Sequence, residues 1–212
     1  MDQQSKGGDN LHHRDCNWRI FEKVICNFSC VFCSNQLAKS YLKRIKSPRL
    51  KVIKTWCREI LQGLEYLHTM KPNPIIHRDI KCDNIFINSN SGEIRIGDLG
   101  LATCMSTSYA DSVLGTPEFM APEMYEESYG TSVDIYSFGM SVLEMVTLQT
   151  PYKECMNAAQ VYKKVISGKK PACLELIANE EVKAFILECL QDQSERPTAT
   201  ELLQHKYVIY FG

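Results

Sequence analysis

The sequence predicts a mainly α-helical domain, a helical bundle that carries one short β-hairpin. Three observations support this fold class. Apolar residues recur every three or four positions from Val52 to Leu67, residues 132–147 are apolar on nearly all sides, and the strand-forming runs 85–87 and 94–96 flank a polar loop. The first pattern is typical of an amphipathic helix, and the second of a helix buried inside a domain.

Residues 1–36 show no sustained period of two or 3.6, so we expect an unassigned, irregular or disordered amino-terminal segment. Within it, the spacing of Cys26, Cys30 and Cys33 resembles the iron–sulfur motif of radical S-adenosylmethionine enzymes. That fold needs alternating strands and helices downstream. The chain does not provide them, and we expect no cluster here.

The remaining elements follow in order. The helix around residues 52–67 should end before Pro72, and the loop 88–92 between the two strands is rich in turn-forming residues. Amphipathic patterns predict helices over 158–166 and 181–190. Thr198 and Glu201 have the spacing of a capping box, which predicts a last helix beginning there. Residues 209–212 form a tail.

Composition excludes several classes of function. The chain has 212 residues and a formal net charge of −1, so no basic surface argues for nucleic-acid binding. Charged residues interrupt the apolar run 18–33, so we expect no membrane span. Most of the ten cysteines fall in helical patterns, and no signal peptide is apparent. We therefore expect a cytoplasmic protein with free thiols.

Three polar motifs follow one another at short range. They are His77-Arg78-Asp79-Ile80-Lys81-Cys82-Asp83-Asn84, Asp98-Leu99-Gly100 and Ala121-Pro122-Glu123. Phosphoryl transfer needs a positioned hydroxyl, charge compensation and magnesium. An aspartate, a lysine and two hard oxygen donors at this spacing can supply them.

This order resembles the carboxy-terminal lobe of a serine/threonine protein kinase, and the details resemble the with-no-lysine (WNK) kinases. Leucine in Asp98-Leu99-Gly100, where most kinases have phenylalanine, is one such detail; residues 81–87 and 115–127 are others. The resemblance implies a kinase-like lobe over residues 37–208, with the hairpin beside the catalytic loop and without the β-sheet of the amino-terminal lobe.

The resemblance also implies roles for individual residues. Asp79 would be the catalytic base, and Lys81 would contact the transferring phosphoryl group of ATP. Asn84 and Asp98 would bind Mg²⁺ and, with it, ATP, and Phe86 would lie under the adenine ring. The residues with implied structural roles are His77, Thr116, Glu123, Asp134 and Arg196.

Regulation is implied in the same way. Ser112 occupies the position of the family's main autophosphorylation site, with Ser108 as a second candidate, and Arg78 would pair with the phosphate. The backbone at Leu99 and Gly100 would bind an inhibitory chloride ion.

The implied function is transfer of the ATP γ-phosphoryl group to serine or threonine hydroxyls of proteins, in ion-transport or osmotic signalling, with sterile-20-type kinases as substrates. No Gly-x-Gly-x-x-Gly motif occurs in the 212 residues, and Lys54 falls within a helical pattern rather than on a strand. We therefore expect the amino-terminal lobe to be missing and this chain alone to lack activity. The alternative is a non-catalytic scaffold or decoy.

Overall fold

The computed structural model describes residues 35–44, 49–88, 90–105, 114–126 and 128–209. The chain divides into two compact units, residues 1–33 and 34–212, and every described residue belongs to the second unit. The expectation of an irregular amino-terminal segment therefore falls almost entirely outside the described residues.

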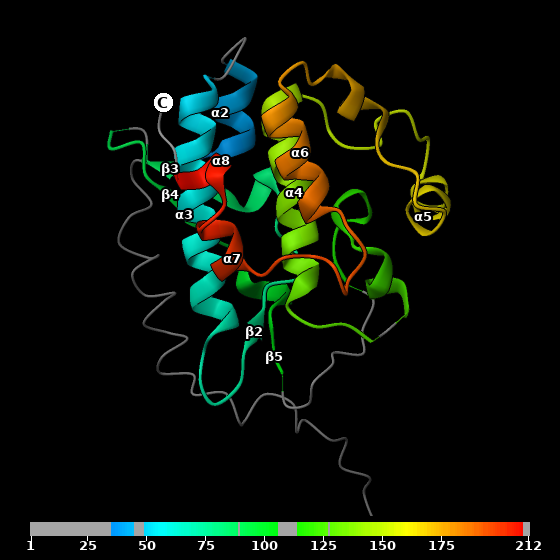
Figure 1. Ribbon diagram of the computed structural model, residues 1–212, viewed down its shortest axis with the longest axis horizontal. Helices are drawn as coiled ribbons and strands as arrows, with labels where there is room; N and C mark the ends of the chain where they lie inside the picture. The colour runs from blue at the N-terminus through cyan, green and yellow to red at the C-terminus, as the bar shows by residue number, and fades with distance from the viewer. Residues whose placement is uncertain (1–34, 45–48, 89, 106–113, 127, 210–212) are drawn as a thin grey trace, which may run out of the picture. The chain divides into compact units, whose positions relative to one another are not determined.

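Helix α4 (Ser132–Thr147) forms the centre of the second unit, because most of its side chains are buried on all sides. The long helix α3 (Leu50–His68) lies beside it and buries one apolar face. Helix α6 (Glu180–Cys189) packs against α4, and α7 (Ala199–Leu203) and α8 (Lys206–Ile209) pack against α3 (Figure 1). The predicted helical bundle is confirmed.

Local sequence explains where several helices begin. Asn157 caps α5 (Ala158–Ile166) by accepting a hydrogen bond from the backbone of Gln160, and Asn179 caps α6 in the same way. At α7, Thr198 accepts from the backbone of Glu201, whose carboxylate accepts from the backbone of Thr198. This is the predicted capping box, which satisfies two backbone donors that a helix start leaves unpaired.

The predicted hairpin consists of β3 (Ile85–Asn88) and β4 (Ile94–Ile96). A third strand, β1 (Asn35–Leu37), pairs with β3 and leads directly into helix α2 (Ala38–Arg44). A second, two-stranded sheet joins β2 (Ile75–Ile76) to β5 (Thr103–Cys104). The sequence did not predict β1, α2 or this second sheet, because short strands and helices depend on partners distant in the chain.

Short 3₁₀ helices complete the fold and lie mainly around the loops described next. They are η1 (Cys82–Asn84), η2 (Leu99–Leu101), η3 (Pro117–Phe119), η4 (Pro122–Glu126) and η5 (Ala172–Leu176).

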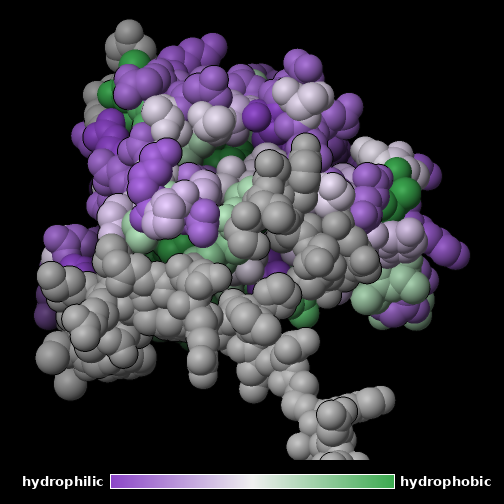
Figure 2. All heavy atoms as spheres, turned by 90° about the horizontal axis from the view of Figure 1, so that it is seen from below, coloured by the Kyte–Doolittle hydropathy of each residue, from purple (hydrophilic) through white to green (hydrophobic). Residues whose placement is uncertain are grey.

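On the described surface visible in Figure 2, hydrophilic side chains predominate and the hydrophobic areas are separate from one another. No helix in the described ranges has the length and hydropathy that a bilayer crossing requires. Five described cysteines have free thiols: Cys57, Cys82, Cys155, Cys173 and Cys189. Cys104, in contrast, is disulfide-bonded, so the expectation of free thiols is wrong at that position.

Candidate active site

The loop between β2 and β3 contains the first polar motif, and a buried carboxylate fixes its backbone. Asp134, in the first turn of α4, accepts hydrogen bonds from the backbone N–H of His77 at 2.8 Å and of Arg78 at 2.9 Å. Its Oδ2 also lies 2.9 Å from Nε2 of His68, the last residue of α3. Arg78 has a positive φ of 69°, a conformation that is uncommon outside glycine. Asp134 thus ties the loop to two helices.

The pKa of Asp134 reflects these contacts. Complete burial raises it, because the charged carboxylate loses its hydration. The hydrogen bond and charge of His68, together with the backbone donors, outweigh this effect and hold the pKa below its ordinary value. Asp134 is therefore ionised at neutral pH.

His77 supports the loop from beneath. Its side chain is fully buried, and Nε2 lies 3.0 Å from the backbone oxygen of Gly97, directly before Asp98. The other ring nitrogen, Nδ1, lies 3.3 Å from the backbone N–H of Asp79. One imidazole therefore joins the loop of Asp79 to the loop of Asp98.

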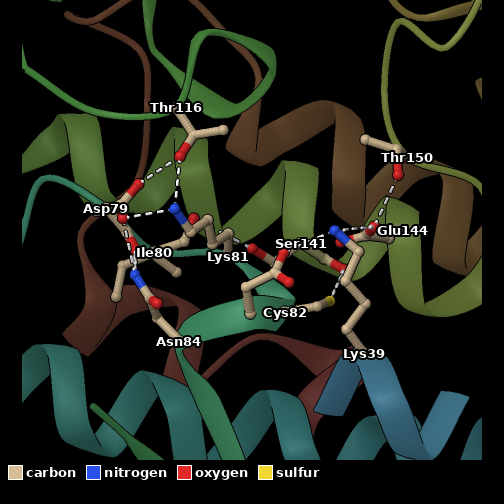
Figure 3. Close-up of polar contacts among 11 residues, drawn as sticks. Lys39, Asp79, Ile80, Lys81, Cys82, Asn84, Thr116, Ser141, Glu144 and Thr150 are labelled. Atoms are coloured by element: carbon tan, nitrogen blue, oxygen red, sulfur yellow. Dashed lines mark hydrogen bonds and ion pairs between the residues drawn. The ribbon is translucent and has the colours of Figure 1, made fainter. Parts of the chain in front are cut away.

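Asp79, Lys81 and Thr116 form a closed polar triangle (Figure 3). The Lys81 ammonium lies 2.7 Å from Asp79 Oδ2 and 2.7 Å from Thr116 Oγ1. The Thr116 hydroxyl donates to Asp79 Oδ1, also at 2.7 Å. Because Thr116 directly precedes η3, this contact fixes the segment before Ala121-Pro122-Glu123 against the Asp79 loop.

The Asp79 carboxylate is also held by Asn84. The amide Nδ2 of Asn84 donates to Asp79 Oδ2 and to the Asp79 backbone oxygen, both at 2.8 Å. Burial raises the pKa of Asp79, but hydrogen bonds from Lys81, Thr116 and Asn84 outweigh burial and place the pKa below its ordinary value. An ionised carboxylate at neutral pH can accept a hydrogen bond from a hydroxyl group.

The hairpin places Asn84 and Asp98 at one end of the small sheet. Ile85 pairs with Ile96, and beyond this pair the backbone N–H of Gly97 donates to the Asn84 oxygen at 2.8 Å. Asp98 follows Gly97, and its side chain is exposed. Because Asn84 uses its Nδ2 on Asp79, its Oδ1 is the atom that can coordinate a cation. An amide oxygen and a carboxylate are ligands that Mg²⁺ prefers, so this donor set fits magnesium.

Comparison with known proteins identifies the family of this chain. The protein kinase domain family matches residues 22–208. The chain belongs to the protein kinase family. It is 59% identical over 170 residues to the mouse serine/threonine-protein kinase WNK3. This match covers 80% of this chain and 10% of the relative.

Two further relatives are the serine/threonine-protein kinases WNK2 of mouse and of human, each 56% identical over 170 residues. These matches cover 80% of this chain and 8% and 7% of the relatives. The resemblance to the WNK kinases is therefore confirmed, and the chain spans a tenth or less of the length of the curated relatives it matches.

Other residues that the kinase resemblance singled out are distributed around this centre. Phe86, on β3, alternates with the buried Ile85 and Ile87 and is half-buried on the opposite face of the sheet. Leu99 and Gly100 lie in η2, where the Gly100 N–H donates to Asp98 Oδ1 at 3.3 Å. Of the two backbone positions expected to face chloride, Gly100 therefore already has its N–H hydrogen-bonded to Asp98.

The expected phosphosites Ser108 and Ser112 lie outside the described residues. The Arg78 side chain extends toward the start of the same segment, where its Nε donates to the Leu101 backbone oxygen at 2.5 Å. The structure thus places Arg78 beside the segment that follows Asp98-Leu99-Gly100.

Glu123 and Arg196 form a buried, bidentate ion pair. The guanidinium also donates to the backbone oxygens of Ser132 and Gln191, at 2.9 and 3.0 Å, and lies over the ring of Tyr136. The pair connects the end of the kinase activation segment to the helical core.

Sequence reasoning missed two residues near the site. One is His68, which contacts Asp134, and the other is Lys39, which contacts Asp83 at 2.7 Å. In the sequence, His68 resembles the polar end of an amphipathic helix, and Lys39 resembles an ordinary solvent-exposed lysine. No sequence signal distinguishes them from ordinary surface residues.

Proposed function

We propose that this chain is the catalytic lobe of a WNK-type serine/threonine protein kinase, which transfers the γ-phosphoryl group of ATP to serine or threonine hydroxyls of proteins. The observation that carries the proposal is the closed triangle of Asp79, Lys81 and Thr116. It joins a carboxylate, an ammonium and a hydroxyl within hydrogen-bond distance at the junction of the catalytic loop and the activation segment. The proposed lobe spans residues 37–208.

In this proposal, Asp79 orients the substrate hydroxyl and accepts its proton. Its low pKa keeps it ionised, and the bonds from Asn84 and Lys81 fix its orientation, so the acceptor is preorganised. Lys81 carries a point charge suited to the negative oxygens of the phosphoryl group. When bound through Asn84 and Asp98, Mg²⁺ would neutralise charge on the ATP phosphates.

Phe86 is proposed as the floor of the adenine site, because its ring lies on the face of the hairpin turned away from the helical core. His77, Asp134, Glu123 and Arg196 are proposed as structural supports. The proposed substrates are proteins, among them sterile-20-type kinases, in ion-transport or osmotic signalling in the cytoplasm.

Regulation by phosphorylation at Ser112, and secondarily at Ser108, is part of the same proposal. A phosphate adds nearly two negative charges, and a nearby guanidinium can bind it bidentately. Arg78 is suited to this role by its place in the catalytic loop and by its contact with Leu101. Chloride binding at Leu99 and Gly100 would require the Asp98 side chain to release the Gly100 N–H.

A substitution at Asp79 tests the proposed activity. The amino-terminal lobe of a WNK kinase is joined ahead of residue 37, and phosphorylation of a serine peptide is measured with Mg²⁺-ATP. Asp79→Asn should lower kcat by about 10²- to 10⁴-fold, the usual contribution of a positioned base. Asp192→Asn, a surface aspartate, serves as the matched control. Equal turnover by Asp79→Asn and the unsubstituted chain would show that Asp79 does not have this role.

The second candidate function is a non-catalytic scaffold or decoy, favoured by the absence of a Gly-x-Gly-x-x-Gly motif from the 212 residues. Without that loop, the ATP phosphates lack the backbone cover that it provides in kinases. We therefore expect calorimetric titration of the full chain with Mg²⁺-ATP to show no binding in the micromolar range. Micromolar binding would contradict this expectation and favour an active chain.

A further inference from the structure

The charges of this chain are distributed unevenly along its length. The chain has 24 Lys and Arg and 25 Asp and Glu. Eight of the basic residues and none of the acidic ones lie in residues 38–58, which leaves 16 basic against 25 acidic residues elsewhere. The formal net charge of −1 therefore averages a strongly basic segment with an acidic remainder, and such asymmetry creates local fields that net charge does not show.

Three of the eight cations have structural contacts. The ammonium groups of Lys39 and Lys54 lie 2.7 and 3.5 Å from carboxylate oxygens of other elements. The Arg58 guanidinium donates to a backbone oxygen near the end of the chain at 2.7 Å. Lys46 lies outside the described residues. These four cations are therefore not used in the argument that follows.

The remaining four cations form one exposed surface, here called the basic corner: Lys43, Arg44, Arg49 and Lys51. The first two end α2, Arg49 directly precedes α3, and Lys51 lies in its first turn. Because Arg44 and Arg49 are five residues apart, at most about 18 Å of chain separates them. Figure 1 shows the end of α2 and the start of α3 at the same end of the two helices. Among the described residues, no carboxylate lies within ion-pair distance of Lys43, Arg49 or Lys51.

The fold holds the basic corner in a fixed direction. The rings of Tyr41 on α2 and Trp56 on α3 meet edge to face, with their centroids 5.7 Å apart. Leu42 and Ile53 lie beside the cations in sequence and are buried in the core. One side of each helix is thus anchored by apolar packing. The four cations consequently point to solvent from a rigid support.

The chemistry of the basic corner fits a broad negative surface better than a nucleic acid. Single-stranded nucleic acids need exposed aromatic rings on which bases stack, and the rings of Tyr41 and Trp56 pack against each other. Val52, next to Lys51, is an apolar side chain that remains 37% exposed. A bilayer interface can accept both exposed cations and a small apolar side chain. The acidic remainder of the chain would be repelled by anionic lipids, so only this face would turn toward them.

We propose that the basic corner docks this kinase lobe on the anionic leaflet of a membrane, through the headgroups of acidic phospholipids. The binding is electrostatic and reversible, since each cation near such a leaflet strengthens binding by about fivefold. It needs no fixed acceptor geometry, which agrees with long cationic side chains on two different helices. The proposal goes beyond phosphoryl transfer and does not depend on it.

The test is cosedimentation of the full chain with vesicles of phosphatidylcholine alone and of phosphatidylcholine mixed with phosphatidylserine. We expect binding to the mixed vesicles only. Binding should weaken as salt is raised from about 0.15 M to about 1 M, because the Debye length falls from about 8 to about 3 Å. The triple variant Lys43→Gln, Arg49→Gln, Lys51→Gln should lose about a hundredfold in affinity, or roughly fivefold for each charge removed.

The matched control is the triple variant Lys153→Gln, Lys163→Gln, Lys169→Gln, which removes the same charge from exposed lysines elsewhere. It should bind mixed vesicles within about twofold of the unsubstituted chain, because charges beyond a Debye length are screened. An equal loss in both triple variants would mean that only net charge matters, and it would overturn the proposal.

Equal binding of the unsubstituted chain to both kinds of vesicle would also overturn it, because apolar contact rather than charge would then drive binding. Binding of a fluorescein-labelled oligoglutamate peptide without binding of mixed vesicles would identify an acidic peptide as the partner instead of a membrane. If the triple variant of the basic corner does not fold, Lys43→Gln and Lys51→Gln must each weaken vesicle binding by about fivefold, or the proposal is wrong.

Discussion

Replacing Asp134 by Ala should strongly destabilise the lobe, because this carboxylate holds the catalytic loop. The substitution leaves two backbone N–H groups, those of His77 and Arg78, and the His68 ring without their acceptor. Each buried donor left unpaired costs about 1–3 kcal/mol. Removing one partner of a buried charged contact costs about 3–5 kcal/mol in all.

We therefore expect the free energy of unfolding of Asp134→Ala to fall by about 3–5 kcal/mol, a large share of the roughly 5–15 kcal/mol typical of a folded domain. Urea denaturation followed by circular dichroism measures this difference. Asp192→Ala removes an exposed carboxylate and is the matched control, expected within about 0.5 kcal/mol of the unsubstituted chain. A loss under about 1 kcal/mol for Asp134→Ala would refute the reasoning that its three contacts anchor the loop.

Three further predictions concern stability. Glu123→Gln leaves the buried Arg196 charge without its partner and should lower the free energy of unfolding by about 3–5 kcal/mol in urea denaturation; an unchanged midpoint would contradict this. Thr198→Ala removes the capping box of α7 and should cost about 1 kcal/mol, whereas Thr198→Ser should restore most of it; equal loss in both variants would argue against the cap. Because the pKa values of Asp79 and Asp134 are lowered in the folded state, their stabilisation is complete above the unfolded pKa near 3.8 and is lost as pH falls through the lower folded values. Acid unfolding of Asp134→Asn should therefore show a smaller decrease in stability between pH 4 and pH 2 than the unsubstituted chain, and identical slopes would contradict this.

The sequence by itself determined the elements whose cause is local. The helix at 132–147 is predicted by its apolar composition, and the capping box at Thr198 and Glu201 by residue type and spacing. The hairpin follows from two strand-forming runs with a polar loop between them. Each of these depends on residues a few positions apart, so periodicity and turn chemistry suffice. The polar motifs likewise indicate the kinase family by residue type and spacing alone.

Tertiary structure alone decided the contacts between residues distant in the chain. Strand β1 forms because β3, some 50 residues later in the chain, supplies its backbone hydrogen-bond partners. The three residues of β1 are too few to show a strand pattern in the sequence. His68 meets Asp134 only because α3 packs beside α4, and Lys39 reaches Glu144 only because α2 docks near the end of α4. A histidine or lysine on a helix looks the same in sequence whether it faces water or a buried carboxylate. Packing geometry determines which of the two it meets, and no local pattern encodes that choice.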